Sequence, residues 1–136
     1  MTLTNTLTIA VDFDGTIVED AYPKIGKERI FAFETLKRLQ ADGHRLILWT
    51  YRSGKYCDEA VEFCRKNGIE FYAVNESFPN EKLKPKTSRK INADLFIDDR
   101  NIGGILSWGE VYQLITKEEP DLSKAKKNKG FLGLFK

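Results

Sequence analysis

Two acidic motifs contain the residues of this chain best suited to chemistry. Asp12-Phe13-Asp14-Gly15-Thr16 comes directly after one apolar run, and Asp98-Asp99 comes directly after another. Four carboxylates brought to one place repel one another, and a bound divalent cation relieves that repulsion. A ligand set made only of oxygen atoms favours Mg²⁺. The two motifs therefore predict a magnesium site, provided that the fold brings them together.

Strand and helix patterns alternate along the chain and predict how the motifs meet. Such alternation is typical of an α/β fold with a parallel sheet of about four strands, covered on both faces. Parallel strands bring their carboxyl ends to one edge of the sheet, where ligands bind. Four polar residues end these strands: Asp12, Thr50, Asn75 and Asp98. The expected strands are residues 7–12, 45–50, 69–74 and 93–98, and the expected helices are residues 27–41, 55–67 and a last helix with an apolar stripe from Trp108 to Ile115.

From residue 7 to about residue 115, the chain resembles the haloacid dehalogenase-like (HAD) superfamily of phosphotransferases in the order and spacing of its motifs. Residues 12–16 match the first HAD motif, Thr50 matches the second and Asp98-Asp99 matches the fourth. The third motif is a single lysine, for which Lys90 is the first choice and Lys86 the alternative.

The resemblance implies a single-domain, Rossmann-like three-layer sandwich. Many members of the superfamily carry a cap domain, inserted after the first motif or after the third strand. Here residues 17–26 and 75–92 are too short to hold one. The resemblance therefore implies a small, capless, phosphatase-type member with an open site.

The resemblance also implies a role for each acidic residue. Asp12 would attack phosphorus and form an aspartyl-phosphate, and Asp14 would act as general acid and then as general base. Asp12, the backbone carbonyl of Asp14, and Asp98 would hold Mg²⁺, while Asp99 would bind it through water or support the ligands. A halide leaving group needs no proton, so Asp14 favours phosphate-ester over carbon–halogen chemistry. The implied function is a Mg²⁺-dependent phosphatase acting on phosphate monoesters.

The phosphate group itself would be held by Thr50 and Lys90, as the resemblance implies. Backbone N–H groups near Phe13, Tyr51 and Arg52 would face the same group. The side chains of Tyr51 and Arg52 are open to two interpretations, as substrate contacts or as surface residues. The expected substrate is a small-molecule phosphate ester, and an open site leaves room for a homo-oligomer in which a second subunit forms the lid.

Charge divides the 136-residue chain into two parts. The net charge is +2, but residues 123–136 carry five lysines and no acid, so removing those charges leaves −3 for residues 1–122. We expect a HAD-like domain over residues 1–120 and a basic, apolar tail over residues 121–136. An acidic body gives no reason to expect a nucleic-acid partner. No apolar run approaches the roughly 20 residues of a membrane span, and no basic segment precedes the first one, which predicts a cytoplasmic protein.

Several residues that often do chemistry have a structural interpretation here. Cys57 and Cys64 are seven residues apart, on one face of an expected helix, which predicts reduced core residues. His44 follows Gly43 in a turn and is predicted at the surface, and Trp49 and Trp108 are predicted to be structural.

Two other functions use similar residues. A binding or regulatory module could keep the fold and the metal site without turnover, although Asp12 and Asp14 are both present. A phospho-accepting receiver domain also uses Asp, Thr, Lys and Mg²⁺, but it carries its phospho-accepting Asp after the third strand. The third strand here ends at Val74-Asn75, which argues against a receiver.

Overall fold

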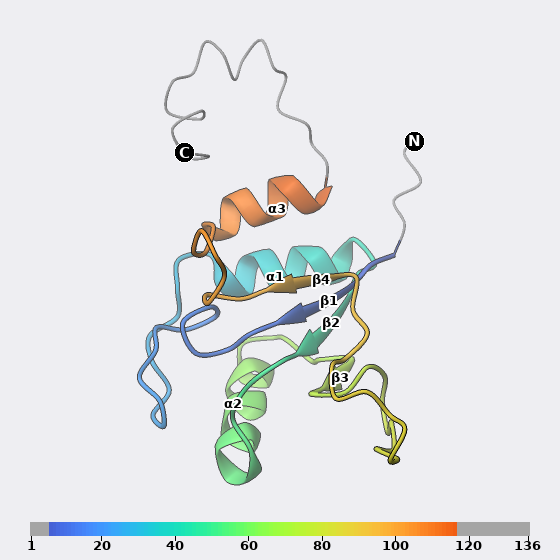
Figure 1. The fold of residues 1–136 in the computed structure, drawn as a ribbon. Coiled ribbons are helices and arrows are strands. Elements are labelled where there is room, and N and C mark those ends of the chain that lie inside the picture. The colour runs from blue at the N-terminus through green and yellow to red at the C-terminus, as the bar shows by residue number, and fades with distance from the viewer. Residues whose placement is uncertain (1–5, 117–136) are drawn as a thin grey trace, which may run out of the picture.

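The computed structural model describes residues 6–116 and shows an α/β fold (Figure 1). Its four strands form one parallel sheet in the order β3-β2-β1-β4. The prediction of an α/β fold with a parallel sheet of about four strands is therefore confirmed. The elements are β1 (Thr8–Val11), α1 (Ala32–Ala41), β2 (Arg45–Leu48), α2 (Gly54–Lys66), β3 (Ala73–Val74), β4 (Leu95–Ile97) and α3 (Trp108–Thr116).

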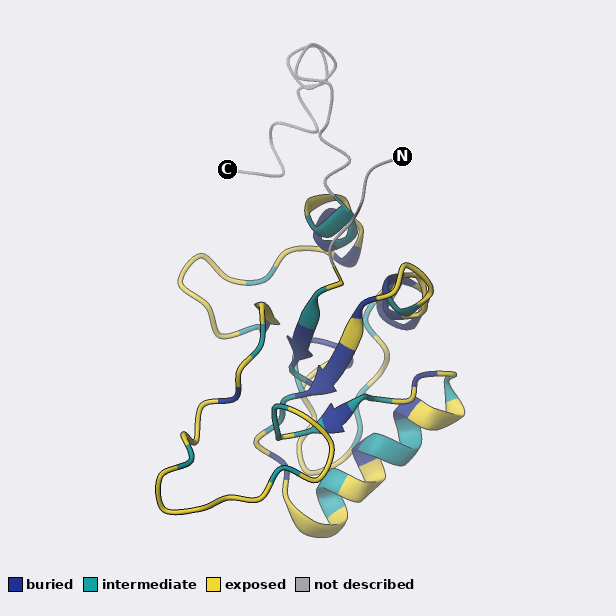
Figure 2. Ribbon diagram, turned by 90° about the vertical axis from the view of Figure 1, so that its right-hand side faces the viewer, coloured by how far each residue is buried: buried dark blue, intermediate teal, exposed yellow. Residues whose placement is uncertain are grey.

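The two faces of the sheet are covered differently. Ile9 and Val11 of β1 pack on the face that all three helices cover, whereas Ala10, between them, packs on the other face with Ile91. Figure 2 shows the helices together on one side of the sheet and mainly loops on the other. Within the described residues, the third layer of the predicted sandwich is thus built by the 75–92 connection instead of a helix.

Chain topology explains this one-sided arrangement. The steps from β1 to β2 and from β2 to β3 run in the same direction along the sheet. Right-handed crossovers therefore place α1 and α2 on the same face. The return from β3 to β4 runs the opposite way and crosses the opposite face, where Ile91 covers Ala10 and Ile47.

The first helix begins later than its sequence pattern predicts. The apolar periodicity indicates a helix from residue 27, but α1 begins at Ala32, after Phe31 adopts a left-handed backbone with φ 65°. The segment before it folds back on itself instead, because Arg29 N donates to Ile17 O at 2.9 Å and Val18 bridges Glu28. Residues 17–31 therefore form a loop that folds back on itself and protrudes at the carboxyl edge of the sheet (Figure 1).

Two other expectations are corrected or narrowed by the structure. His44 is 7% exposed and not at the surface, because its Nδ1 accepts a hydrogen bond from Leu7 N at 3.1 Å, just before β1 begins. Cys64 is buried as predicted, whereas Cys57 is only half-buried. Burial raises the pKa of the Cys64 thiol to about 12, which suits an unreactive core residue.

The predicted basic tail over residues 121–136 lies outside the described residues, as does the end of the domain predicted for residues 1–120. Within residues 6–116, no helix has the length and apolar character needed to cross a bilayer.

Candidate functional site

The acidic motifs meet because of strand register. Val11 of β1 pairs with Ile97 of β4, so the next residues, Asp12 and Asp98, emerge side by side at the carboxyl edge. The backbone continues this pairing for one more step, since Asp12 N donates to Ile97 O at 2.9 Å. Carboxylate oxygens of Asp12, Asp98 and Asp99 all lie within 4.8 Å of one another. The sheet thus brings together three of the four acids that the sequence predicted to meet.

The Asp12 carboxyl has an unusual electrostatic environment. Its pKa is raised to about 8, mainly by burial; the Thr16 hydrogen bond opposes that shift, and a hydrogen bond that protonated Asp12 donates to Asp99 and the charges of Asp98 and Asp99 add to it. Burial and the two neighbouring carboxylates therefore both disfavour negative charge on Asp12. Three carboxylates with oxygen donors facing one small volume fit the ligand preferences of Mg²⁺.

The Gly-Thr part of the first motif has a structural explanation. Gly15 has φ +86°, and a Cβ there would overlap the Asp99 carboxylate, so glycine is what allows Asp99 to approach the loop. Thr16 Oγ donates to Asp12 Oδ2 at 2.9 Å and fixes the rotation of that carboxylate. Both residues therefore hold the acidic cluster in shape.

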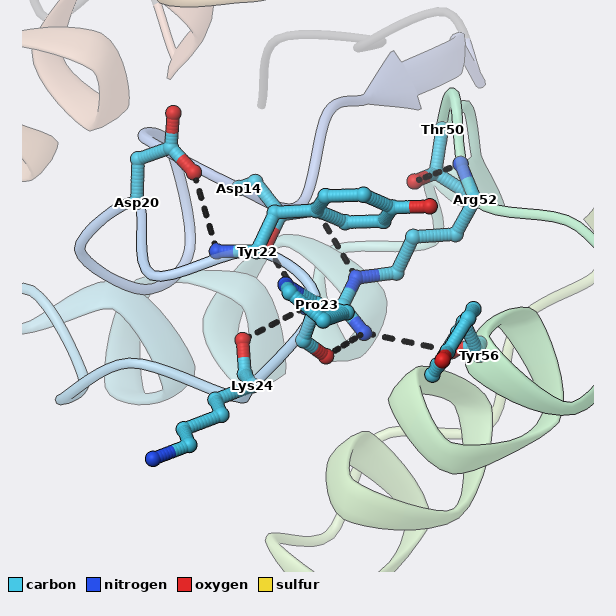
Figure 3. Close-up of polar contacts among 8 residues, drawn as sticks. All are labelled: Asp14, Asp20, Tyr22, Pro23, Lys24, Thr50, Arg52 and Tyr56. Atoms are coloured by element: carbon cyan, nitrogen blue, oxygen red, sulfur yellow. Dashed lines mark hydrogen bonds and ion pairs between the residues drawn. The ribbon is translucent and has the colours of Figure 1, made fainter.

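Asp14, the predicted acid and base, is held by a buried arginine (Figure 3). Arg52 Nε and Nη2 donate to the two Asp14 carboxylate oxygens, each at 2.8 Å. Arg52 also donates to the backbone carbonyls of Pro23 at 3.0 Å, Lys24 at 2.8 Å and Tyr56 at 3.4 Å. The Asp14 side chain thus belongs to an arginine clamp, consisting of Arg52 and these acceptors, and its carboxylate is not part of the three-acid cluster.

The environment of the Arg52 side chain is the part of the site that the sequence predicted least well. The sequence left it open as a substrate contact or a surface residue, but Arg52 is 1% exposed. Its guanidinium lies 5.1 Å from the Phe13 ring centroid and 5.2 Å from that of Tyr22. The clamp ties together the first motif, the loop before α1 and the first turns of α2. Nothing in the local pattern Thr50-Tyr51-Arg52 indicates this long-range role.

The second motif is held by a neighbouring strand end. Thr50 N donates to Asn75 Oδ1 at 2.8 Å, and Thr50 Oγ accepts from Arg52 N at 3.1 Å. Asn75 follows β3 in a left-handed backbone with φ 54°. Its place at a strand end marked it in the sequence, but its role in positioning Thr50 emerges only in the structure.

A cavity of about 890 Å³ lies over the carboxyl edge of the sheet. Five carboxylates line it, and they come from Asp12, Asp14, Asp20, Asp98 and Asp99. The rest of its lining is formed by Tyr22, Trp49, Thr50, Tyr51, Arg100 and Asn101. Trp49, predicted to be structural, therefore also faces the candidate site.

The lysine of the third motif lies beside this cavity and not in its lining. Lys90 is exposed, and its Nζ lies 5.8 Å from the centroid of the Phe96 ring. Phe96 in turn packs edge-on against Trp49, with centroids 6.4 Å apart. Lys86, the alternative, is also exposed and lies outside the lining formed by the described residues.

Adding Mg²⁺ to the metal-free protein is expected to raise its melting temperature, because the cation relieves repulsion that exists only in the folded state. At a free concentration 100-fold above the dissociation constant, the gain is about 2.7 kcal/mol. Thermal unfolding followed by circular dichroism, with and without Mg²⁺, measures it. Asp98→Asn is the control and should respond less, while an unchanged wild-type melting temperature would argue against a metal site.

Comparisons with known proteins show a similarity to a solved structure. No family model and no curated protein matches the chain. Among solved structures, it is similar to "Structure of the conserved protein coded by locus from Bacteroides thetaiotaomicron", with 58% sequence identity and a TM-score of 0.80. The match covers 85% of this chain and 94% of that one. The chain therefore belongs to the same family as this conserved Bacteroides thetaiotaomicron protein.

Proposed function

We propose that this protein is a magnesium-dependent phosphate monoester hydrolase with chemistry of the HAD type. The observation that carries the proposal is the meeting of Asp12, Asp98 and Asp99 at one edge of the sheet, under a large open cavity. The resemblance of the sequence motifs supports it, since the first, second and fourth motifs each follow a strand of the fold, β1, β2 and β4. The proposed substrate is a small-molecule phosphate ester.

The cation would be held by the carboxylates of Asp12 and Asp98 and by the backbone carbonyl of Asp14, with Asp99 beside them. When bound, Mg²⁺ supplies positive charge that offsets the negative charge of the phosphate and of the surrounding carboxylates. This role agrees with the raised pKa of Asp12, which reflects burial first and then the neighbouring carboxylates of Asp98 and Asp99.

Asp12 is the proposed nucleophile. One of its carboxylate oxygens bonds to phosphorus while the bond from phosphorus to the ester oxygen breaks, giving an aspartyl-phosphate and a free alcohol. Water then attacks phosphorus, the bond to Asp12 breaks, and inorganic phosphate leaves. The hydrogen bond from Thr16 Oγ keeps the carboxylate in one orientation during both steps.

Asp14 is the proposed proton carrier for these steps. It gives a proton to the departing ester oxygen and later takes one from the attacking water. Both of its oxygens accept hydrogen bonds from Arg52 in this structure, one to each oxygen, so each oxygen keeps a second lone pair that a proton can occupy.

The phosphate oxygens would be bound by the Thr50 hydroxyl and by backbone N–H groups of Phe13, Tyr51 and Arg52, with the Lys90 ammonium adding positive charge. The backbone N–H of Arg52 now donates to Thr50 Oγ, so a phosphate oxygen would compete with the Thr50 hydroxyl for this N–H. Lys90 is one ring contact from the cavity wall, through Phe96. Contact with the phosphate would therefore require Lys90 to move, because it lies outside the cavity lining.

One observation favours a second candidate function, a regulatory module that binds Mg²⁺ and phosphate groups without turnover. In the arginine clamp, Asp14 is fully engaged with a buried guanidinium. A protein that kept this pairing on binding its ligand would have a metal site and a nucleophile, while Asp14 stayed in the clamp, outside the three-acid cluster.

Hydrolysis of para-nitrophenyl phosphate separates the two candidates. We expect turnover in the presence of Mg²⁺, loss of turnover after chelation with EDTA, and recovery when Mg²⁺ is restored, because the acidic cluster repels phosphate without a cation. Magnesium-dependent binding of inorganic phosphate without hydrolysis of any ester in a substrate panel would favour the regulatory module. Turnover that survives complete chelation would contradict the proposed mechanism.

A further inference from the structure

Two tyrosine rings line the cavity, and a third packs against one of them. Tyr22 packs edge-on against Tyr51, with ring centroids 6.1 Å apart and an interplanar angle of 72°. Tyr22 also packs against Tyr56, with centroids 5.9 Å apart. Tyr22 and Tyr51 line the cavity together with the acidic cluster. We name these two residues the tyrosine shelf.

The tyrosine shelf has one fixed ring and one open ring. Tyr22 is 44% exposed and lies across the Arg52 side chain, whose guanidinium is 5.2 Å from its ring centroid (Figure 3). Because the arginine clamp holds Arg52, it also limits where Tyr22 can move. Tyr51 directly follows Thr50, and it is 91% exposed. Packing within the described residues thus leaves most of the Tyr51 ring free beside the proposed phosphate-binding hydroxyl.

An exposed aromatic ring at this position suits contact with a ligand. Offset stacking of two flat rings contributes about 0.5–1.5 kcal/mol beyond the burial of apolar area. The tyrosine shelf lines the same cavity as Thr50 and the acidic cluster, so the ester group of a phosphate bound there would lie in the cavity that the shelf lines. The group best matched to an open tyrosine face is another flat ring.

The charge of the cavity further limits which ester groups it would accept. Five carboxylates line the cavity, and the lining contains one cationic side chain, Arg100. Asp20 is the acid that lies outside both the cluster and the arginine clamp. A second anionic group on the substrate would meet Asp20 unfavourably, whereas a neutral or cationic ring would not.

We propose that the tyrosine shelf binds the leaving group, and that the substrate is the phosphate monoester of an alcohol carrying a flat, neutral or cationic aromatic ring. This inference rests on the proposed phosphate site and names the substrate class of that same site. Tyr51 then determines specificity through its ring face and takes no part in the bond-breaking steps.

Benzyl phosphate and cyclohexylmethyl phosphate are the matched probes. Both release a primary alcohol with a six-membered carbon ring, and only benzyl phosphate presents a flat ring. We expect kcat/KM with Mg²⁺ to be about 3- to 10-fold higher for benzyl phosphate, from the energy of ring stacking. Equal kcat/KM values, or a higher value for cyclohexylmethyl phosphate, would overturn this inference. Hydrolysis of both esters in that case would still support the proposed function.

Variants of Tyr51 test which residue makes the distinction. Tyr51→Phe keeps the ring and should keep the preference, whereas Tyr51→Leu should bring the ratio of the two kcat/KM values close to one. Phe78→Leu removes an exposed ring that does not line the cavity and should leave the ratio unchanged. A ratio that persists in Tyr51→Leu would contradict the assignment to Tyr51.

Binding provides a readout that does not depend on turnover. Trp49 lines the cavity and Trp108 is 2% exposed, so ligand-induced fluorescence changes should report mainly on Trp49. Benzylphosphonate should bind more tightly than cyclohexylmethylphosphonate, and Tyr51→Leu should remove the difference. Tighter binding of benzylphosphonate without hydrolysis of either ester would support the preference for a flat ring and refute the proposed hydrolase activity. Absence of both binding and hydrolysis would refute the ring preference and the hydrolase activity. A Tyr51→Leu effect on self-association alone would assign the shelf to a protein contact and overturn the inference.

Discussion

Replacing Asp12 with Asn is expected to abolish ester hydrolysis while the protein remains folded. Asparagine has nearly the same shape and can still accept the Thr16 hydrogen bond, but its amide oxygen is a poor nucleophile and a weaker metal ligand. Loss of a nucleophile that acts together with its neighbours lowers kcat by at least about 10⁴-fold. Initial rates with para-nitrophenyl phosphate and saturating Mg²⁺ measure this loss.

Asp20→Asn is the matched control for Asp12→Asn. It makes the same chemical change in the same cavity but outside the acidic cluster, so turnover of para-nitrophenyl phosphate should change by no more than a few-fold. Activity that survives in Asp12→Asn would place the nucleophile elsewhere. Equal losses in the two variants would mean that cavity charge, and not a specific nucleophile, determines the rate.

Stability gives an independent measure of the Asp12 environment. In the metal-free protein the pKa of Asp12 rises from 3.8 to about 8, so between these values the folded state holds a proton that the unfolded chain has released. The free energy of unfolding contributed by this group therefore falls as pH rises through that range. Asp12→Asn should remove this part of the pH dependence and should be more stable than wild type near pH 8, as urea unfolding can show.

Replacing Arg52 with Ala is expected to be among the most destabilising single changes in the chain. The substitution leaves the Asp14 carboxylate, whose side chain is 16% exposed, without its cation, and it removes donors from three backbone carbonyls. Breaking a buried ion pair by removing one partner costs about 3–5 kcal/mol. Urea unfolding should show a lower midpoint for Arg52→Ala, with an intermediate value for Arg52→Lys, which keeps the charge but not the two-point contact.

The exposed pair of Arg65 and Glu62 on α2 provides the control, since Arg65→Ala should leave the urea midpoint almost unchanged. A double-mutant cycle with Asp14→Asn measures how much of the Arg52 effect depends on Asp14. Additive effects in that cycle would show that Arg52 stabilises the protein through the backbone carbonyls and the Phe13 and Tyr22 rings instead.

The arginine clamp also bears on the choice between the two candidate functions. Asp14 can act as a proton carrier only when one of its oxygens reaches the ester oxygen, and Arg52 now fixes the orientation of both oxygens. Measured turnover would support a bound substrate that places its ester oxygen within reach of Asp14. Binding without turnover would agree with an Asp14 that the clamp holds out of reach.

The acidic cluster was predictable because it depends on features that are local in sequence. Each acid directly follows a run of apolar residues that forms a strand, and all strands of a parallel sheet end at the same edge. Asp12 and Asp98 are 86 residues apart, yet one backbone pairing, Asp12 N to Ile97 O, brings them together. Element type and strand-end chemistry were sufficient for this part of the site.

Helix boundaries and burial were less predictable where distant contacts outweigh local pattern. The periodicity before Ala32 is helical, but pairing of Val18 with Glu28 takes that backbone away from the helix. His44 follows a turn glycine, yet Leu7 N at the entry to β1 recruits its ring into a buried position. In both cases the deciding partner is a backbone group elsewhere in the chain.

Local patterns in the sequence were enough to predict the alternation of strands and helices, the parallel sheet and the meeting of Asp12 with Asp98 and Asp99. The contacts of the folded chain were needed to show that Arg52 is buried against Asp14, that the helices share one face of the sheet and that Tyr51 is exposed next to Thr50. The physical reason is that strand and helix formation depends mainly on residues that are close together in the sequence. The direction of a long side chain depends instead on the distant hydrogen-bond acceptors and rings that surround it in the folded protein.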